Sequence, residues 1–241
     1  MQIKQSHKYA FAWCTDSAEH LQAADFSAAP WQQNNAITGQ SKGRYTTWFV
    51  QPEQVEQQWV LRHYWRGGLA EKLSKDAYLY TGLHNTRAIA ELGLLEQLYN
   101  EGFAVPKPIA AQIQRFGIWY RADIIIERIA GAQDLVAILS AHPMNDALWF
   151  SLGVTIAKFH QRGVYHADLN AKNILLTGEQ FYLIDFDRGE LRKANSHWQQ
   201  ANISRLKRSF DKEKTKLPKL AFTENNWQQL LKGYQQQLAA A

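Results

Sequence analysis

The amino-acid sequence predicts an α+β protein with a small lobe of strands and one main helix, followed by a mainly helical lobe. Two observations lead to this expectation. Strand-like runs with one helical stretch fill residues 1–127, and the remainder of the 241-residue chain is mostly helical in pattern. Strands grouped before helices are typical of α+β architecture. We expect the boundary between residues 127 and 128, inside a single domain.

The first lobe is predicted from two pairs of strand-like runs. Residues 43–50 and 58–64 are rich in β-branched and aromatic side chains and are separated by a polar turn containing Pro52. Two further runs cover residues 109–114 and 118–126. The pattern of residues 1–35 is mixed and assigns no element there.

Two long helices are predicted from apolar residues at helical spacing. The first covers residues 86–99, with Thr86 as N-cap and Gly102 after its end. The second covers residues 145–161 and ends before Gly163. Two short apolar strands, residues 174–176 and 181–184, follow in the second lobe.

Composition restricts the class of protein. Hydrophobic residues make up 46% of the chain and charged residues 20%, which are ordinary values for a soluble globular protein. The single cysteine, Cys14, excludes an intramolecular disulfide framework and a multi-cysteine zinc site. No run approaches 18 apolar residues, and the first residues lack the apolar core of a signal peptide. We therefore expect a cytoplasmic protein.

The basic charge is concentrated near the C-terminus. The net charge is +5, but residues 187–219 alone carry ten basic and four acidic side chains. Such a segment predicts an anionic partner, either a nucleic acid, a phosphorylated substrate or an acidic membrane surface, or else simply a solvated basic face. Because no nucleic-acid-binding motif accompanies the charge, we expect no nucleic-acid partner.

The strongest chemical signal is a pair of neighbouring motifs, His166-Ala-Asp-Leu-Asn-Ala-Lys-Asn173 and Leu183-Ile-Asp-Phe-Asp187. They resemble the catalytic loop and the metal-binding segment of the protein-kinase-like superfamily. Phosphoryl transfer needs a carboxylate that orients the acceptor hydroxyl, and Asp168 has that place. Asn173 and Asp185 supply the oxygen ligands that Mg²⁺ prefers. His166 is expected to brace the loop. The resemblance implies a two-lobed kinase-like fold with an antiparallel sheet in the first lobe.

Departures from the protein-kinase pattern indicate a small-molecule or sugar acceptor. Ala167 replaces the usual arginine, and Asn170 occupies a position where protein kinases often carry lysine. Asp187 replaces the glycine that follows Asp185-Phe186, and no Ala-Pro-Glu motif follows. Asp187 is either a second metal ligand or a partner for Arg188.

The first lobe contains candidate nucleotide-binding residues. Gly39 and Gly43 bound a segment that is either a phosphate-binding turn or an ordinary hairpin loop. Glu91 has the place of the acidic residue of helix αC. Glu127 lies where the hinge between the lobes is expected, and the backbone there would meet the adenine of ATP.

The expected partner of the αC carboxylate is a lysine on the third strand. The sequence has Arg62 at that place, and a guanidinium can also bind phosphate. Lys72 and Lys75 are the alternatives for this role.

A closer resemblance rests on four segments, Leu61-Arg-His-Tyr-Trp-Arg-Gly-Gly68, Tyr78-Leu-Tyr-Thr-Gly82, Tyr165-His-Ala-Asp-Leu-Asn170 and Leu183-Ile-Asp-Phe-Asp-Arg-Gly189. They are similar to the 3-deoxy-D-manno-octulosonic acid (Kdo) kinases of the lipopolysaccharide core kinase group, over residues 39–210. The resemblance implies ATP-dependent phosphorylation, with Mg²⁺, of the 4-hydroxyl of Kdo on a lipid A precursor. It also implies a peripheral membrane protein at the cytoplasmic face of the inner membrane, with the acidic glycolipid and the anionic membrane surface as partners.

Three alternatives compete with this interpretation. A heptose kinase of the same core or an aminoglycoside-type phosphotransferase would keep Asp168, Asn173 and Asp185, but neither needs the Arg-His-Tyr-x-Arg-Gly-Gly segment. A nucleotide-binding pseudokinase scaffold is favoured by Arg62 at the lysine place and opposed by the intact set of three polar residues.

Overall fold

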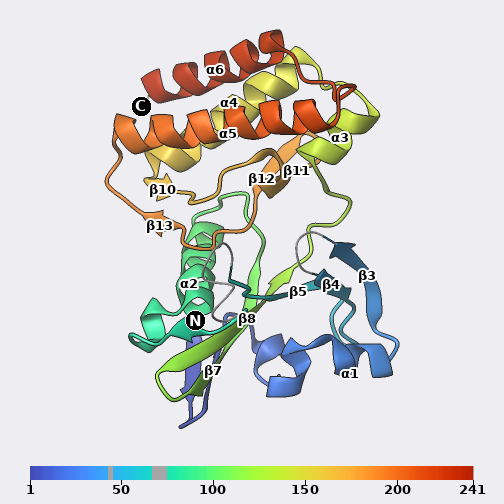
Figure 1. Cartoon of the computed structure of the whole chain (residues 1–241), viewed down its shortest axis with the longest axis vertical. Helices are drawn as coiled ribbons and strands as arrows, with labels where there is room; N and C mark the ends of the chain where they lie inside the picture. Colours follow the sequence, from blue (N-terminus) through green and yellow to red (C-terminus); the bar gives the residue numbers. More distant parts are fainter. Residues whose placement is uncertain (43–45, 67–74, 241) are drawn as a thin grey trace. The chain divides into compact units, whose positions relative to one another are not determined.

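The computed structural model describes residues 1–42, 46–66 and 75–240 of the chain (Figure 1). The described chain divides into two compact units. The first unit comprises Met1–Gly102 and Pro106–Ala130, and the second comprises Phe103–Val105 and Gly131–Ala241. Gly43 and Lys72, which the sequence analysis named, lie outside the described residues.

An antiparallel sheet forms the centre of the first unit. Its strands are ordered β1-β2-β7-β8-β5-β4-β3, and β6 also pairs with β8. The strands are β1 (Gln2–Gln5), β2 (Tyr9–Trp13), β3 (Ile37–Lys42), β4 (Thr46–Val50), β5 (Trp59–His63), β6 (Tyr78–Leu79), β7 (Pro108–Phe116) and β8 (Trp119–Glu127).

Both predicted strand pairs are present. β4 and β5 form an antiparallel hairpin in which Val50 lies opposite Trp59, and β7 pairs with β8 along its length. Leu61 of β5 lies opposite Ile125 of β8, and these four named side chains are all almost fully buried. Alternation along each strand places them on one face, where they form the core of the sheet.

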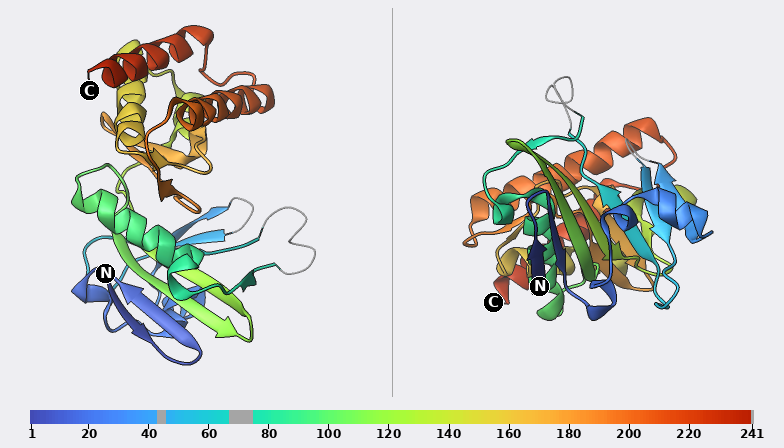
Figure 2. Two further views of the ribbon diagram at one scale, coloured as in Figure 1. Left: turned by 90° about the vertical axis from the view of Figure 1, so that its left-hand side faces the viewer. Right: turned by 90° about the horizontal axis from the view of Figure 1, so that it is seen from below.

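One helix covers the sheet, as predicted. α2 (Arg87–Asn100) packs against β7 and β8 (Figure 2). Its leucines at helical spacing are buried. Thr86 occupies the N-cap position, but its hydroxyl donates to the carbonyl oxygen of Leu83 and caps no helical N–H. Gly102 follows the helix with φ of 82°, a left-handed conformation that glycine adopts without steric cost.

Two features of the first unit differ from the sequence analysis or extend it. Gly39 lies inside β3, opposite Phe49 of β4, and not in a turn. A Cβ atom at Gly39 would lie 3.2 Å from the Phe49 ring, so the glycine serves close packing between the strands. The unassigned N-terminal residues form the β1–β2 hairpin, which extends the sheet beyond β7, and the short helix α1 (Ala28–Gln33).

Helices dominate the second unit. They are α3 (Leu135–Ala141), α4 (Asp146–Gln161), α5 (Ser196–Lys216) and α6 (Glu224–Ala239). The predicted helix over residues 145–161 is α4, and Asn145 caps it by accepting the N–H of Leu148. α4 and α6 lie unusually close at Gly153, which has no side chain. A Cβ atom there would be only 2.0 Å from the carbonyl oxygen of Leu230.

Short strands complete the second unit: β9 (Gln133–Asp134), β10 (Val164–Tyr165), β11 (Ile174–Thr177), β12 (Gln180–Leu183) and β13 (Glu190–Leu191). β11 and β12, the two predicted short strands, form an antiparallel hairpin. Within the described residues, no helix combines the length and the apolar character needed to cross a membrane.

Candidate active site

His166 ties the catalytic-loop motif to the strand that precedes Asp185. Its side chain is buried, and its Nδ1 accepts the N–H of Asp168 at 3.2 Å. The other ring nitrogen, Nε2, therefore carries the proton and donates to the carbonyl oxygen of Ile184 at 2.9 Å. Burial lowers the pKa of His166, so the ring is neutral and suited to this bridging. This geometry agrees with a bracing role.

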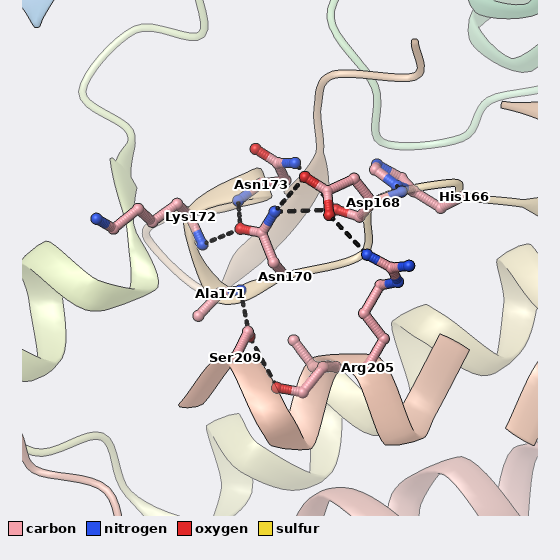
Figure 3. A network of polar contacts seen from close by, with 9 residues as sticks. His166, Asp168, Asn170, Ala171, Lys172, Asn173, Arg205 and Ser209 are labelled. Atoms are coloured by element: carbon pink, nitrogen blue, oxygen red, sulfur yellow. Dashed lines mark hydrogen bonds and ion pairs between the residues drawn. The ribbon is translucent and has the colours of Figure 1, made fainter. Parts of the chain in front are cut away.

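Asp168 presents its carboxylate to solvent from a loop whose backbone is held in place. Its side chain is 58% exposed. Asn170 donates to its carbonyl oxygen at 3.0 Å and to its Oδ2 at 3.1 Å, and Asn173 donates to the same carbonyl oxygen at 3.0 Å (Figure 3). The carboxylate is accessible, while one of these contacts orients it directly and the other two hold the backbone behind it.

Asn170 has a second function in the loop. Its Oδ1 accepts the N–H groups of Lys172 and Asn173 and so caps the short helical turn Ala171–Asn173. The N–H of Ala171 donates to the Ser209 hydroxyl of α5 at 3.0 Å, which fixes the turn to that helix. From the sequence, Asn170 stands out only as a departure from the protein-kinase pattern, although an asparagine that begins such a turn is a recognisable capping signal.

Asn173 and Asp185 lie at the same end of the β11–β12 hairpin. Asn173 immediately precedes β11 and Asp185 follows β12, and the N–H of Ile184 donates to the carbonyl oxygen of Asn173 at 3.0 Å. Asp185 has φ of 63°, a conformation that is uncommon for a residue with a side chain and is frequent at functional sites. An amide and a carboxylate brought together in this way form a donor set that suits a hard divalent cation such as Mg²⁺.

Arg205 brings a positive charge to Asp168. Its Nη1 lies 3.1 Å from Oδ1 of Asp168, and its side chain is 47% exposed (Figure 3). Arg205 lies on α5, 37 residues away along the chain, and no local pattern connects the two. In the sequence, Arg205 stands out only as a member of the basic segment of residues 187–219.

The first unit brings Arg62 and Glu91 together. Nη2 of Arg62 lies 2.5 Å from Oε2 of Glu91, whose side chain is only 1% exposed. The Tyr64 hydroxyl, which sequence analysis did not identify, donates to the same oxygen at 2.5 Å. Lys75 is exposed, and its carbonyl oxygen accepts the N–H of Arg66.

The remaining predicted residue, Glu127, is the last residue of β8. It lies opposite Trp59, and its N–H donates to the carbonyl oxygen of Lys107 at 2.9 Å. Its expected role near the adenine stays a prediction.

Comparison with known sequences identifies a close family. Residues 28–234 match the model of the "Lipopolysaccharide kinase (Kdo/WaaP) family". A 3-deoxy-D-manno-octulosonic acid kinase of Actinobacillus succinogenes is 41% identical, over 98% of this chain and 99% of the relative. A protein of the same name from Vibrio vulnificus strain YJ016 is 46% identical, over 93% of this chain and 94% of the relative.

Solved structures show the protein-kinase-like fold. WaaP, determined in complex with acyl carrier protein, superimposes with a TM-score of 0.54 and 15% identity, covering 86% of this chain and 82% of WaaP. The Rio2 kinase of Chaetomium thermophilum gives a TM-score of 0.53 with 17% identity, covering 90% of this chain and 76% of Rio2. The predicted fold class is therefore confirmed.

Proposed function

Because this chain belongs to the lipopolysaccharide kinase (Kdo/WaaP) family, it is a phosphotransferase with an alcohol acceptor, and we propose that it uses ATP and Mg²⁺ to phosphorylate the 4-hydroxyl of Kdo on a lipid A precursor. The observation that carries this proposal is the exposed carboxylate of Asp168 on its braced loop. The lipid-linked acceptor would bring the enzyme to the cytoplasmic face of the inner membrane.

Asp168 is the proposed general base. The acceptor hydroxyl donates its proton to the Asp168 carboxylate while its oxygen bonds to the γ-phosphorus of ATP, and the bond from that phosphorus to the leaving ADP oxygen breaks. Such assistance is typically worth about 10²–10⁴-fold in rate. Asn170 donates to the Asp168 carboxylate and sets the direction from which it meets the hydroxyl, and Asn173 holds the backbone carbonyl of Asp168 behind it.

Asn173 and Asp185 are the proposed magnesium ligands. Magnesium, when bound, neutralises charge on the triphosphate. Nδ2 of Asn173 donates to the carbonyl oxygen of Asp168, and this fixes the side chain with its amide oxygen directed away from that contact. The hydrogen bond from the N–H of Ile184 to the carbonyl oxygen of Asn173 holds the backbone next to Asp185 beside Asn173.

In this proposal the first lobe, which we place at residues 1–127, binds the nucleotide, and the second lobe, residues 128–241, binds the acceptor. Glu91 orients the Arg62 guanidinium, which contacts phosphate. The predicted phosphate contact of Gly43 lies outside the described residues, and the backbone at Glu127 meets the adenine.

Arg205 favours an acidic sugar as acceptor. A hydroxyl that donates to Asp168 must lie within about 2.6–3.2 Å of it, and Arg205 is itself 3.1 Å from Asp168. The guanidinium is therefore within reach of a group on the same sugar as the reacting hydroxyl. Kdo carries a carboxylate, which a guanidinium binds well through paired hydrogen bonds, whereas a neutral heptose carries none.

Transfer of labelled phosphate from ATP to a Kdo-bearing lipid A precursor tests the function, and NMR of the product identifies the phosphorylated hydroxyl. Asp168→Ala should lower the turnover rate by about 10²-fold or more with unchanged folding. Asp16→Ala, which removes an exposed carboxylate of the first unit, is the control and should be fully active. Near-normal turnover by folded Asp168→Ala would refute the assignment.

The magnesium ligands are tested by nucleotide affinity with and without Mg²⁺. Asp185→Asn and Asn173→Ala should each weaken binding of ATP in the presence of Mg²⁺ and leave metal-free binding nearly unchanged. If neither substitution alters the magnesium dependence, the metal is held elsewhere.

Acceptor selection is tested with Arg205→Gln and with Kdo acceptors whose carboxyl group is methylated. A lost charge-assisted hydrogen bond is worth about 1.5–3 kcal/mol, so Arg205→Gln should raise the acceptor KM by about 10–100-fold. Methylation of the acceptor should raise the KM of the wild-type enzyme by a similar factor and leave the KM of Arg205→Gln almost unchanged. Equal sensitivity of both enzymes to methylation would show that Arg205 does not bind the carboxylate.

A further inference from the structure

One end of the sheet in the first unit exposes a group of large apolar side chains. The exposed fractions are 65% for Ile118, 55% for Leu79, 38% for Trp119 and 37% for Phe116. These are half of the large hydrophobic residues that are exposed in the described chain. We call these four residues the tip patch, because three of them lie in or beside the β7–β8 turn.

Backbone hydrogen bonds hold the tip patch in place. Gly117 has φ of 59° and allows the tight turn between β7 and β8. Leu79 of β6 lies opposite Trp119, and the N–H of Tyr80 donates to the carbonyl oxygen of Ile118 at 2.8 Å. The turn is thus joined to a third segment of chain, and its apolar side chains remain exposed on an ordered structure.

Basic side chains lie near the tip patch. The guanidinium of Arg121 lies 4.8 Å from the Phe116 ring centroid, and that of Arg115 lies 4.0 Å from the Tyr80 ring. The β1–β2 turn lies beside the β7–β8 turn (Figure 2). It carries the exposed Lys8, whose carbonyl oxygen accepts the N–H of Arg115 at 2.7 Å. Asp76 pairs with Arg121, which leaves the group of three cations with an excess of positive charge.

We propose that the tip patch inserts into the headgroup region of an anionic lipid bilayer. Tryptophan and other aromatic side chains favour the membrane–water interface, and arginine and lysine can extend their charged ends toward lipid phosphates while their stems stay in apolar surroundings. The combination of an apolar turn with surrounding cations fits such a surface by shape and by charge. The inference rests on the proposed function in that a lipid-linked acceptor requires the enzyme to reach a membrane.

A bilayer fits this surface better than a folded protein does. The four side chains together expose on the order of 400 Å², if a whole large side chain offers about 150–250 Å². A stable protein interface buries about 800 Å² on each partner. A projecting hairpin turn is also a poor match for a flat protein surface, but it can enter a fluid headgroup layer.

The basic segment on α5 is a weaker candidate for lipid contact. Arg205 pairs with Asp168, and Lys207 pairs with Asp211 at 2.7 Å and with Glu224 at 3.5 Å. These contacts occupy two of the cations that a lipid surface would need, whereas the tip patch combines cations with exposed apolar side chains.

Sedimentation with vesicles tests the inference on the whole protein. The probe is vesicles of phosphatidylethanolamine with phosphatidylglycerol, and vesicles of phosphatidylcholine serve for comparison. Ile118→Ser/Trp119→Ser should weaken binding to the anionic vesicles by about 10-fold or more, since it removes most of the inserting surface. The control Ile3→Ser/Tyr99→Ser removes two exposed apolar side chains elsewhere in the same unit and should bind normally.

Two further measurements separate insertion from simple loss of structure. Trp119→Phe should still bind, but the quenching of tryptophan fluorescence by brominated lipid should fall sharply. Lys8→Glu/Arg115→Gln should weaken binding to anionic vesicles more at low salt than at high salt, and should not affect binding to phosphatidylcholine. Unchanged quenching in Trp119→Phe would show that Trp119 does not enter the bilayer.

A failure of membrane insertion can be distinguished from a failure of the proposed kinase function. Ile118→Ser/Trp119→Ser should phosphorylate a water-soluble, deacylated Kdo acceptor at the normal rate and lose activity only on the membrane-bound acceptor. Normal vesicle binding by this variant would overturn the inference. A wild-type protein that binds vesicles through the tip patch but phosphorylates no Kdo acceptor would refute the function alone.

Discussion

Replacing Arg62 with methionine should destabilise the first unit as well as impair catalysis. Glu91 keeps its carboxylate in an almost fully buried position, and Arg62 and Tyr64 both donate to its Oε2. Breaking a buried ion pair by removing one partner costs about 3–5 kcal/mol. Because Tyr64 remains as a donor and Arg62 is 19% exposed, we expect a loss near 3 kcal/mol at the lower end of that range.

Thermal unfolding of the purified variant measures this loss. A destabilisation of about 3 kcal/mol corresponds to a fall of about 6–12 °C in Tm for a chain of this size. Arg121→Met is the matched control, because Arg121 also pairs with a carboxylate, at 2.7 Å from Asp76, but its side chain is 43% exposed. The control should lose less than about 1 kcal/mol.

A double variant isolates the interaction itself. Combining Arg62→Met with Glu91→Leu should cost less than the sum of the two single changes, since the charge left buried by the first is removed by the second. Additive effects, or an Arg62→Met protein as stable as the control, would refute the reasoning. Arg62→Lys should retain part of the ATP affinity, and an active Arg62→Met enzyme would move the phosphate contact to Lys72 or Lys75.

Packing and burial in the helical unit give two more expected outcomes. Gly153→Ala should destabilise the protein strongly, because the new Cβ would lie 2.0 Å from a backbone oxygen of α6. The control Gly93→Ala on α2 meets only a side-chain atom at 3.9 Å and should stabilise the protein by roughly 0.5–1 kcal/mol. Equal Tm shifts for the two variants would contradict this. Burial lowers the pKa of His160 to about 4 from 6.5, so stability should be full above pH 6.5 and should fall by about 3 kcal/mol as the pH drops toward 4. Urea unfolding of His160→Gln across this range should show a smaller pH dependence, and an unchanged slope would exclude His160 as the source.

Local signals in the sequence determine most elements of this protein. Side-chain periodicity is a property of about ten consecutive residues, and it locates α2, α4, β5, β7 and β8 within a few residues of their observed ends. The spacing of Asp168, Asn173 and Asp185 likewise lies within one loop and one hairpin, so the sequence identifies these residues as a group. Their proposed common site follows from the sequence because the intervening chain is short and returns on itself as β11 and β12.

Tertiary structure decides which distant segments meet. The contact of Arg205 with Asp168 joins residues 37 positions apart, and that of Tyr64 with Glu91 joins residues 27 positions apart. Neither contact has a local pattern, because each depends on how a helix packs against a loop or a sheet. The place of Gly39 inside β3 and the position of the tip patch at the sheet end depend on strand pairing, and pairing is set by contacts between segments that the chain itself keeps far apart.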